Sequence, residues 1–185
     1  MNVIDIFSSF LAIDVLELDN TELEAFCRSK ITNDKTNSGF LDLTAPELTP
    51  LLSIITQKIN ELHLNLGLSP DYVQEISLAW ANQNYPNSAT QSHSHPESFF
   101  SCVYYVTGDE SNGSIHFVTP ITQMLPTVRP PMVKDWNKYW NEFWKVPPHA
   151  NMLVIFPSWI WHYVDQRNSS TDRISIAFDT KIKLK

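Results

Sequence analysis

The sequence predicts an α+β domain, mainly β, with helices near its N-terminus and a β-sandwich or barrel as its core. Two observations lead to this prediction. Two helices are indicated within the first 70 residues, whereas most of the rest of the chain is a series of short β-rich segments joined by turns. The length of 185 residues is that of one domain with a sizeable core. We therefore expect a single domain, residues 1–185, in which residues 1–70 support a β core formed by residues 71–185.

The N-terminal part is predicted to hold one or two strands and two helices. Alternating apolar residues in the range 4–18 indicate the strands. Asn20, followed by acidic residues, is typical of a helix start. For the second helix we expect Thr49 as the N-cap, with Pro50 at the first helical position. Apolar residues then recur at helical spacing until Gly67, so this helix is expected to pack one face on a sheet.

The β core is predicted from six segments rich in β-branched and aromatic residues. They are residues 72–84, 99–106, 114–118, 152–156, 159–164 and 173–182. A proline-rich insert, residues 119–148, lies between the third and fourth of these segments. It carries five aromatic residues at helical spacing: Trp136, Tyr139, Trp140, Phe143 and Trp144. The spacing predicts a short helix that covers one sheet, and the alternative is a lid or wall for a substrate.

Composition excludes several classes of partner. With 13 basic and 20 acidic residues the net charge is −7, so no cationic surface for nucleic acid is expected. The chain has only 4 glycines, and no dinucleotide-binding G-x-G-x-x-G can be formed from them. Gly108 and Gly113 have the outer spacing of a P-loop, but Ser114 and Ile115 replace its Lys and Ser/Thr. We therefore expect neither nucleic acid nor a loop-bound nucleotide as a ligand.

The N-terminus and the hydropathy pattern favour a cytoplasmic protein with no membrane partner. The first 19 residues contain acidic residues but no Lys or Arg, unlike a secretory signal or a transit peptide. No apolar run approaches the ~20 residues of a membrane span. Cys27 and Cys102 form no C-x-x-C motif and no disulfide framework, so we expect two buried thiols. The oligomeric state is left open by the sequence.

Three histidines form a candidate metal site. His93 and His95 are two residues apart, and in an extended strand this spacing points both imidazoles to the same face. His162 ends an apolar segment, where a third ligand would lie at the mouth of a barrel. The alternative for the first pair is two solvent-facing or locally bonded histidines beside Pro96.

Arg173 and Ser175 form a candidate carboxylate-binding pair. Both lie at the start of the last predicted strand, and the same two-residue spacing places the guanidinium and the hydroxyl on one face. A guanidinium binds a carboxylate through two parallel hydrogen bonds, and the serine hydroxyl can add a third. The alternative for Arg173 is a surface ion pair with Asp172 or Asp179.

The order of these motifs resembles the pattern H-x-D/E, distant H, R-x-S of the Fe(II)/2-oxoglutarate-dependent dioxygenases, which have a double-stranded β-helix (jelly-roll, cupin-like) fold. Two segments are similar to a smaller family of 2-oxoglutarate/iron oxygenases found in phages and marine bacteria. These segments, residues 80–106 with SHSHPESFFSCVYYV and residues 148–178 with IFPSWIWHYVDQRNSSTDRISIAF, match its H-x-H-P, S-G-V-Y-Y-V, F-P-S-W-x-x-H and R-I-S-I-A-F. The resemblance does not extend to the N-terminal helices, which are expected to pack on one sheet of the β-helix.

The resemblance implies an enzyme that uses Fe(II), 2-oxoglutarate and O2, hydroxylates a substrate and releases succinate and CO2. The implied iron ligands are His93, His95 and His162. The implied partners of the distal carboxylate of 2-oxoglutarate are Arg173 and Ser175. A tyrosine that lies against the cosubstrate in related oxygenases corresponds to Tyr104 or Tyr105. Two further polar residues that could point into the same cavity are Asn82 and Asn84.

The sequence departs from the general oxygenase pattern at two positions. His95 stands where the pattern has Asp or Glu, so either the site has three histidines or Glu97 supplies the carboxylate. Three neutral imidazoles leave bound Fe(II) at +2, whereas two imidazoles and a carboxylate leave it at +1. We favour His95, because the smaller family has its second histidine there. The other departure is Cys102, which replaces a glycine of the family pattern.

Two other functions remain possible on the sequence alone. One is a cupin-like metalloenzyme with three histidine ligands that does not use 2-oxoglutarate. The other is a non-catalytic β-barrel that acts as an interaction protein. Arg173 and Ser175 discriminate against the first, because a metalloenzyme without an anionic cosubstrate does not need them.

Overall fold

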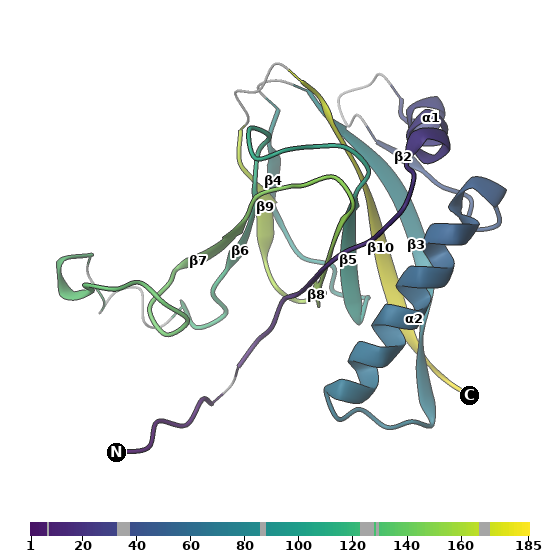
Figure 1. Cartoon of the computed structure of the whole chain (residues 1–185). Helices are drawn as coiled ribbons and strands as arrows, with labels where there is room; N and C mark the ends of the chain where they lie inside the picture. Colours follow the sequence, from purple (N-terminus) through teal and green to yellow (C-terminus); the bar gives the residue numbers. More distant parts are fainter. Residues whose placement is uncertain (7, 33–37, 86–87, 123–127, 129, 167–170) are drawn as a thin grey trace.

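In the computed structural model the chain folds into two facing antiparallel sheets, with two α-helices on the outer face of the larger one (Figure 1). The structure describes all residues except 7, 33–37, 86–87, 123–127, 129 and 167–170. Within this described part, the helices are α1 (Thr21–Lys30) and α2 (Thr49–Asn65), and short 3-10 turns occupy Pro46–Leu48 and Pro130–Met132. The α+β, mainly β prediction is confirmed, and the arrangement is a double-stranded β-helix.

The larger sheet has the strand order β1-β8-β5-β10-β3-β2, and the smaller has the order β4-β9-β6-β7. The larger sheet consists of β1 (Ala12–Val15), β8 (Met152–Pro157), β5 (Phe100–Tyr105), β10 (Arg173–Leu184), β3 (Tyr72–Asn84) and β2 (Ser38–Phe40). The smaller sheet consists of β4 (Thr90–His93), β9 (His162–Val164), β6 (Ile115–Val118) and β7 (Phe143–Val146).

The central strands of the larger sheet are buried on both faces. On β10, Ile174, Ile176 and Phe178 point toward the helices and join the core that lies between α1, α2 and the sheet. The residues that alternate with them, Arg173 and Ser175, point to the other face, which is covered by the smaller sheet. A second apolar cluster, formed mainly by β5, β6 and β8, fills the space between the two sheets. The helices thus cover one face of the larger sheet, and its opposite face is available for a functional site.

Most predicted elements are confirmed, with differences at their ends. The strand predicted for residues 72–84 is β3 with the same bounds. Among the described residues of the range 4–18, the strand is β1, Ala12–Val15. Thr49 is already the first residue of α2, and Leu48 is its N-cap, because the preceding 3-10 turn runs directly into the helix. The strand expected at 159–164 begins only at His162, since residues 158–160 form a turn after β8.

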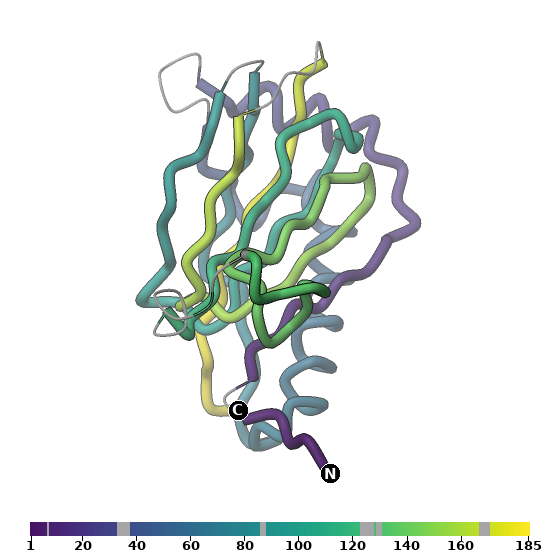
Figure 2. The backbone as a smooth tube through the Cα atoms, turned by 90° about the vertical axis from the view of Figure 1, so that its left-hand side faces the viewer, coloured from purple at the N-terminus to yellow at the C-terminus, as the bar shows by residue number. Residues whose placement is uncertain are grey.

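The helix predicted in the insert at residues 119–148 is wrong for the residues that the structure describes. Asn137 closes a single turn, in which its carbonyl accepts the N–H groups of Trp140 and Asn141. Phe143 and Trp144 instead belong to β7, which pairs with β6. The five aromatic residues from which this helix was predicted are each at least 41% exposed, so they do not cover a sheet. The described part of the segment projects away from the two sheets (Figure 1) and lies in front of them when seen from that side (Figure 2).

The sequence pattern did not predict β2, β4 or β7. Their sequences, SGF, TQSH and FWKV, show no alternation of apolar and polar residues, and each is defined by the strand it pairs with. Among the described residues, no helix has both the length and the apolar character that crossing a membrane requires.

The packing of β10 against the helices makes a prediction about stability. Phe178 is fully buried, so Phe178→Ala should lower the free energy of unfolding by about 3–5 kcal/mol through lost burial and a residual cavity. The matched control is Phe40→Ala, because Phe40 is 74% exposed on β2 and its loss should change stability by less than about 0.5 kcal/mol. Urea unfolding measures both changes. Equal effects of the two substitutions would contradict this account of the core.

Candidate metal centre

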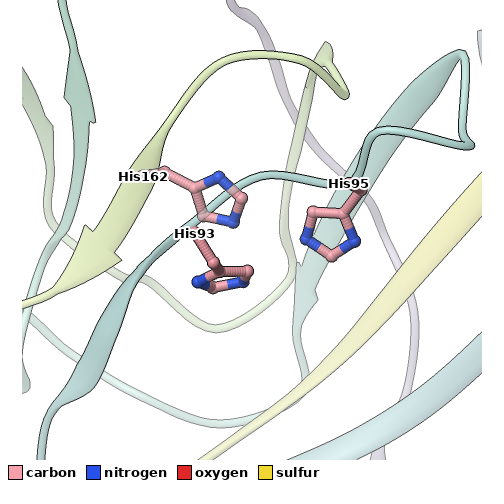
Figure 3. Close-up of side chains that lie close together, drawn as sticks. All are labelled: His93, His95 and His162. Atoms are coloured by element: carbon pink, nitrogen blue, oxygen red, sulfur yellow. The ribbon is translucent and has the colours of Figure 1, made fainter.

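The three candidate ligands are brought together by strand pairing and by one loop contact. His93 is the last residue of β4, and it is directly paired with His162, the first residue of β9. His95 lies two residues beyond the end of β4, and its backbone N–H donates a hydrogen bond to the carbonyl of Ser158 at 2.8 Å. The three imidazoles therefore come from a strand, the loop that follows it and a neighbouring strand, and they face one another (Figure 3).

The geometry of the three imidazoles fits a single metal ion. One nitrogen of each ring lies within 4.8 Å of the corresponding nitrogens of the other two. The ring centroids are 4.3 Å apart for His93 and His162, 5.1 Å for His93 and His95, and 5.3 Å for His95 and His162. Glu97 is exposed in the turn after His95 and is not part of this group. Within the described residues, the group that could hold a metal is thus composed of histidines only.

Hydrogen bonds show which nitrogen of each ring faces the shared centre. The Nδ1 atoms of His93 and His162 lie 2.8 Å and 3.0 Å from the backbone carbonyls of Gln91 and Ile160. The Nδ1 atom of His95 lies 2.9 Å from Oδ2 of Asp179. A carbonyl or an ionised carboxylate only accepts hydrogen bonds, so each Nδ1 carries the proton and each Nε2 keeps its lone pair. This is the arrangement that metal-binding histidines require.

Burial keeps His162 in the neutral form that a metal ligand needs. The pKa of His162 is lowered to about 4, chiefly by desolvation and also by the neighbouring His93 and His95, although the hydrogen bond to the Ile160 carbonyl and the charge of Asp179 act in the opposite direction. Its ring packs against the rings of Phe156 and Phe117, with centroids 4.9 Å and 6.0 Å away. At neutral pH the imidazole is therefore uncharged and free to share its lone pair.

Arg173 is the first residue of β10 and lies on the face that the smaller sheet covers. It is only 2% exposed. Its Nη1 donates to the carbonyl of Gly113, and its Nη2 donates to Oδ1 of Asn84 at 2.8 Å. The guanidinium also lies over the ring of Tyr105, with its carbon 5.5 Å from the ring centroid. These contacts fix the plane of the guanidinium inside the molecule.

The alternative of a surface ion pair for Arg173 is wrong, because the residue is buried. The two acidic residues considered for that pair have other partners. Asp172 accepts hydrogen bonds from Arg28 and Gln83, and Asp179 accepts from His95.

Gly108 leaves room for the side chain of Arg173. Gly108 has a φ of +140°, and a Cβ atom at this position would lie 3.1 Å from Cγ of Arg173. A side chain here would be strained by the backbone conformation and would crowd the arginine. One of the few glycines of the chain thus serves the candidate site by making room for a side chain.

Ser175, Asn82 and Tyr105 lie side by side on three adjacent strands. The register pairs Ser175 with Asn82 of β3 and with Tyr105 of β5. All three are therefore on the face of the sheet that carries Arg173. Tyr105 is fully buried, and this burial raises the pKa of its hydroxyl. The structure thus groups these residues, with Asn84, around the arginine.

Tyr104, the alternative to Tyr105, is not part of this group. Its side chain points to the helix-side core. The Tyr104 hydroxyl lies 2.9 Å from Oδ1 of Asn20 and 2.7 Å from Oδ1 of Asn151. These contacts tie the start of α1 to the turn before β8, which is a structural role.

Four residues of the metal centre were missed by the sequence analysis: Trp80, Ser101, Ser158 and Asp179. The ring of Trp80 stacks on His95 with centroids 5.6 Å apart. One carboxylate oxygen of Asp179 is hydrogen-bonded to His95, and the other accepts a hydrogen bond from Ser101. The signal for Asp179 was present, because the two-residue spacing of Arg173 and Ser175 continues through residue 177 to residue 179.

A double-stranded β-helix with converging imidazoles between its sheets defines a metal-binding protein of the oxygenase and cupin type of fold. A model of one family, described as "Putative 2OG-Fe(II) oxygenase", matches residues 78–179, which is more than half of the chain. The chain belongs to this family of 2OG-Fe(II) oxygenases, and Fe(II) and 2-oxoglutarate are accordingly its cofactor and cosubstrate. No curated protein matches it in sequence.

Solved structures share the fold at low sequence identity. A prolyl-4-hydroxylase from Pseudomonas putida is similar with a TM-score of 0.61 and 17% identity, over 92% of this chain and 91% of that one. HygX from Streptomyces hygroscopicus is similar in its iron-bound form, with a TM-score of 0.59 and 12% identity over 93% of this chain and 82% of that one. The same protein with nickel and 2-oxoglutarate bound gives a TM-score of 0.60, again with 12% identity and with coverage of 93% and 82%.

The low pKa of His162 predicts a pH-dependent loss of stability in the metal-free protein. In the unfolded chain this histidine takes up a proton near pH 6.5, but in the folded chain only near pH 4. The unfolded state therefore binds more protons between these values, and stability falls as the pH falls. We expect this group alone to reduce the free energy of unfolding by about 2 kcal/mol between pH 7 and pH 5.

Urea unfolding with a chelator present, at pH 7 and pH 5, measures this loss in the wild type and in two variants. His162→Asn should remove the contribution and flatten the dependence. His149→Asn is the control, because His149 is exposed and its loss should leave the dependence unchanged. An unchanged dependence in His162→Asn would show that burial does not hold His162 neutral.

Proposed function

We propose that this protein is an Fe(II)- and 2-oxoglutarate-dependent dioxygenase that hydroxylates a substrate, whose chemical class the sequence leaves open, and releases succinate and CO2. The observation that carries the proposal is the convergence of three Nε2 atoms, each fixed by a hydrogen bond at Nδ1. We further propose that residues 1–185 act as one oxygenase domain, since α1 and α2 share a core with the larger sheet.

In this proposal His93, His95 and His162 bind iron through Nε2. These three side chains would hold the metal, and 2-oxoglutarate and O2 would supply its remaining ligands. When bound, Fe(II) supplies the oxygen activation that couples decarboxylation of 2-oxoglutarate to oxidation of a substrate C–H bond. The protein's part is to orient the three imidazoles, to hold His162 neutral, and to keep water away with the rings of Phe117 and Phe156.

Arg173 and Ser175 are proposed to bind the distal carboxylate of 2-oxoglutarate. The guanidinium offers donors in a planar fork, and the hydroxyl of Ser175 lies on the same face. Along β10, Arg173 is four residues from Ala177, which is paired with Trp80, the residue stacked on His95. At ~3.3 Å per residue, these two backbone positions are about 13 Å apart, a span that the long side chain of Arg173, the cosubstrate and the imidazole side would fill together.

Tyr105 and Asn82 are proposed to line the cosubstrate pocket between these two ends. Tyr105 lies beneath the guanidinium and beside Ser175, where its ring orients Arg173 and excludes water. Asn82 lies on the other side of Ser175 and can offer its amide to the same ligand. Tyr104 has no part in this proposal.

The proposal predicts that 2-oxoglutarate binding depends on Arg173. Anaerobic addition of Fe(II) and then 2-oxoglutarate to the wild type should produce the weak visible charge-transfer band of the ternary complex. In Arg173→Ala the band should require at least about 30-fold more 2-oxoglutarate, because removing one partner of a buried charge pair costs about 2 kcal/mol or more. Arg28→Ala is the matched control, since Arg28 is a partly exposed arginine of α1 paired with Glu24.

Two results would overturn the proposal and point to other functions. Iron binding without a band, and with turnover unaffected in Arg173→Ala, would indicate a three-histidine metalloenzyme that does not use 2-oxoglutarate. A folded wild type that binds no iron would indicate a non-catalytic protein.

A further inference from the structure

We propose that Asp179 is a positioning residue of the metal centre, which holds His95 in place and supplies, through a hydrogen bond, the negative charge that H-x-D/E oxygenases supply as a metal ligand. This inference rests on the proposed iron site. It concerns the way one ligand is held and what charge surrounds the metal.

Asp179 is buried and is bonded at both carboxylate oxygens. Its Oδ2 accepts from Nδ1 of His95 at 2.9 Å, and its Oδ1 accepts from the hydroxyl of Ser101 at 2.6 Å. The residue is only 6% exposed, so solvent does little to weaken these bonds. The carboxylate is therefore held in one orientation, with one oxygen aimed at the imidazole.

The same contacts close a ring around His95. The Ser101 hydroxyl lies 3.0 Å from the hydroxyl of Ser158, which is itself fully buried. The Ser158 carbonyl in turn accepts the backbone N–H of His95 at 2.8 Å. His95 is thus held at its ring by Asp179 and at its backbone by Ser158, and the two serines connect these two points.

His95 needs this support more than the other two ligands do. His93 and His162 are strand residues that are paired with each other in the register of β4 and β9. His95 lies outside the strand, in the loop that leads to β5. Side-chain contacts must therefore set the direction of its imidazole, and the bond to Asp179 also selects the tautomer with Nε2 available for a metal.

The backbone around Asp179 is adapted to this contact. The ladder between β10 and β3 shifts register between Asp179 and Thr180. At the shift, the hydroxyl of Ser77 donates to the carbonyl of Asp179 at 3.2 Å. Such irregularities are frequent next to active sites, where they change the direction of a side chain. Here the irregularity fixes the backbone of the residue that holds His95.

Charge gives Asp179 a second role. The Nδ1–H groups of His93 and His162 bond to neutral carbonyls, whereas that of His95 bonds to a carboxylate. Three neutral imidazoles leave bound Fe(II) at +2, and the adjacent Asp179 brings the centre to +1. This is the net charge of a site with two histidines and one carboxylate. In this protein the negative charge is thus carried by Asp179, which is hydrogen-bonded to His95, and not by the residue at position 95.

The inference is tested by metal affinity, with Co(II) as the probe. Competition with a chelating dye gives the dissociation constant, and the visible absorption of bound Co(II) reports the geometry of its ligands. Asp179→Ala should weaken Co(II) binding by about 10- to 100-fold, because it removes a partner of a metal-bound histidine. Asp179→Asn, which removes the charge but can still accept from His95, should weaken it by about tenfold. Both should alter the visible spectrum.

A matched control is available in Asp165→Asn. Asp165 accepts from His116 at the same distance of 2.9 Å, but this pair lies outside the group of three ligands. Its loss should leave the affinity for Co(II) unchanged. Ser101→Ala keeps the charge of Asp179 and its contact with His95, and should weaken binding only a few-fold; it serves as the second variant should Asp179→Asn not fold.

A double variant separates positioning from a general structural role. If Asp179 acts mainly through His95, then Asp179→Asn should weaken Co(II) binding much less in a His95→Ala background than in the wild type. Wild-type affinity in a folded Asp179→Asn variant, or an equal loss in both backgrounds, would overturn the inference while leaving the iron site intact. Failure of the wild type to bind Co(II) would instead contradict the proposed function.

Discussion

The alternation of side chains along β10 is the constraint on which the rest of the structure depends. One face of this strand carries Ile174, Ile176 and Phe178, which are buried against α1, α2 and their core. The other face carries Arg173 and, six residues later, Asp179. The apolar face fixes the register and orientation of the strand, because a slip by one residue would exchange the two faces. The helix-side core therefore determines where the charged groups of the site lie.

Polar groups within the β-helix are stable only because they have partners. Burying an unpaired charge costs far more than one hydrogen bond returns, so each charged group of the site must be bonded before a ligand arrives. Arg173 meets this requirement with the Gly113 carbonyl and Asn84, and Asp179 meets it with His95 and Ser101. The result is a site whose side chains are already oriented, which lowers the cost of binding a metal and an anionic cosubstrate.

The sequence predicts the parts of this architecture that depend on local patterns. The bounds of β3 and the common face of Arg173 and Ser175 both follow from the period of a strand. The fold class follows from the same periodicity. The sequence of β4, TQSH, carries no such pattern, and this strand is defined by its pairing with β9. The helix predicted from the spacing of aromatic residues in the insert is wrong, because two of these residues, Phe143 and Trp144, belong to a strand.

Two features of the site depend on tertiary contacts that no local pattern contains. Both faces of β5 are buried and each carries a tyrosine, so the sequence did not distinguish which of Tyr104 and Tyr105 faces the smaller sheet. The position of His95 depends on a backbone bond to Ser158, which is remote in the sequence, and on the carboxylate of Asp179. The two-residue spacing places Asp179 on the same face of β10 as Arg173. Its contact with His95, however, is evident only once the loop that carries His95 is placed in space.

A crystal structure of the protein grown without oxygen, with Fe(II) and 2-oxoglutarate, tests the central claim most directly. Anomalous scattering at the iron absorption edge locates the metal without reference to the protein atoms. The account predicts one iron bound by Nε2 of His93, His95 and His162, with the distal carboxylate of 2-oxoglutarate on Arg173 and Ser175. Iron bound by the carboxylate of Glu97 in place of His95, or a cosubstrate that does not reach Arg173, would contradict it.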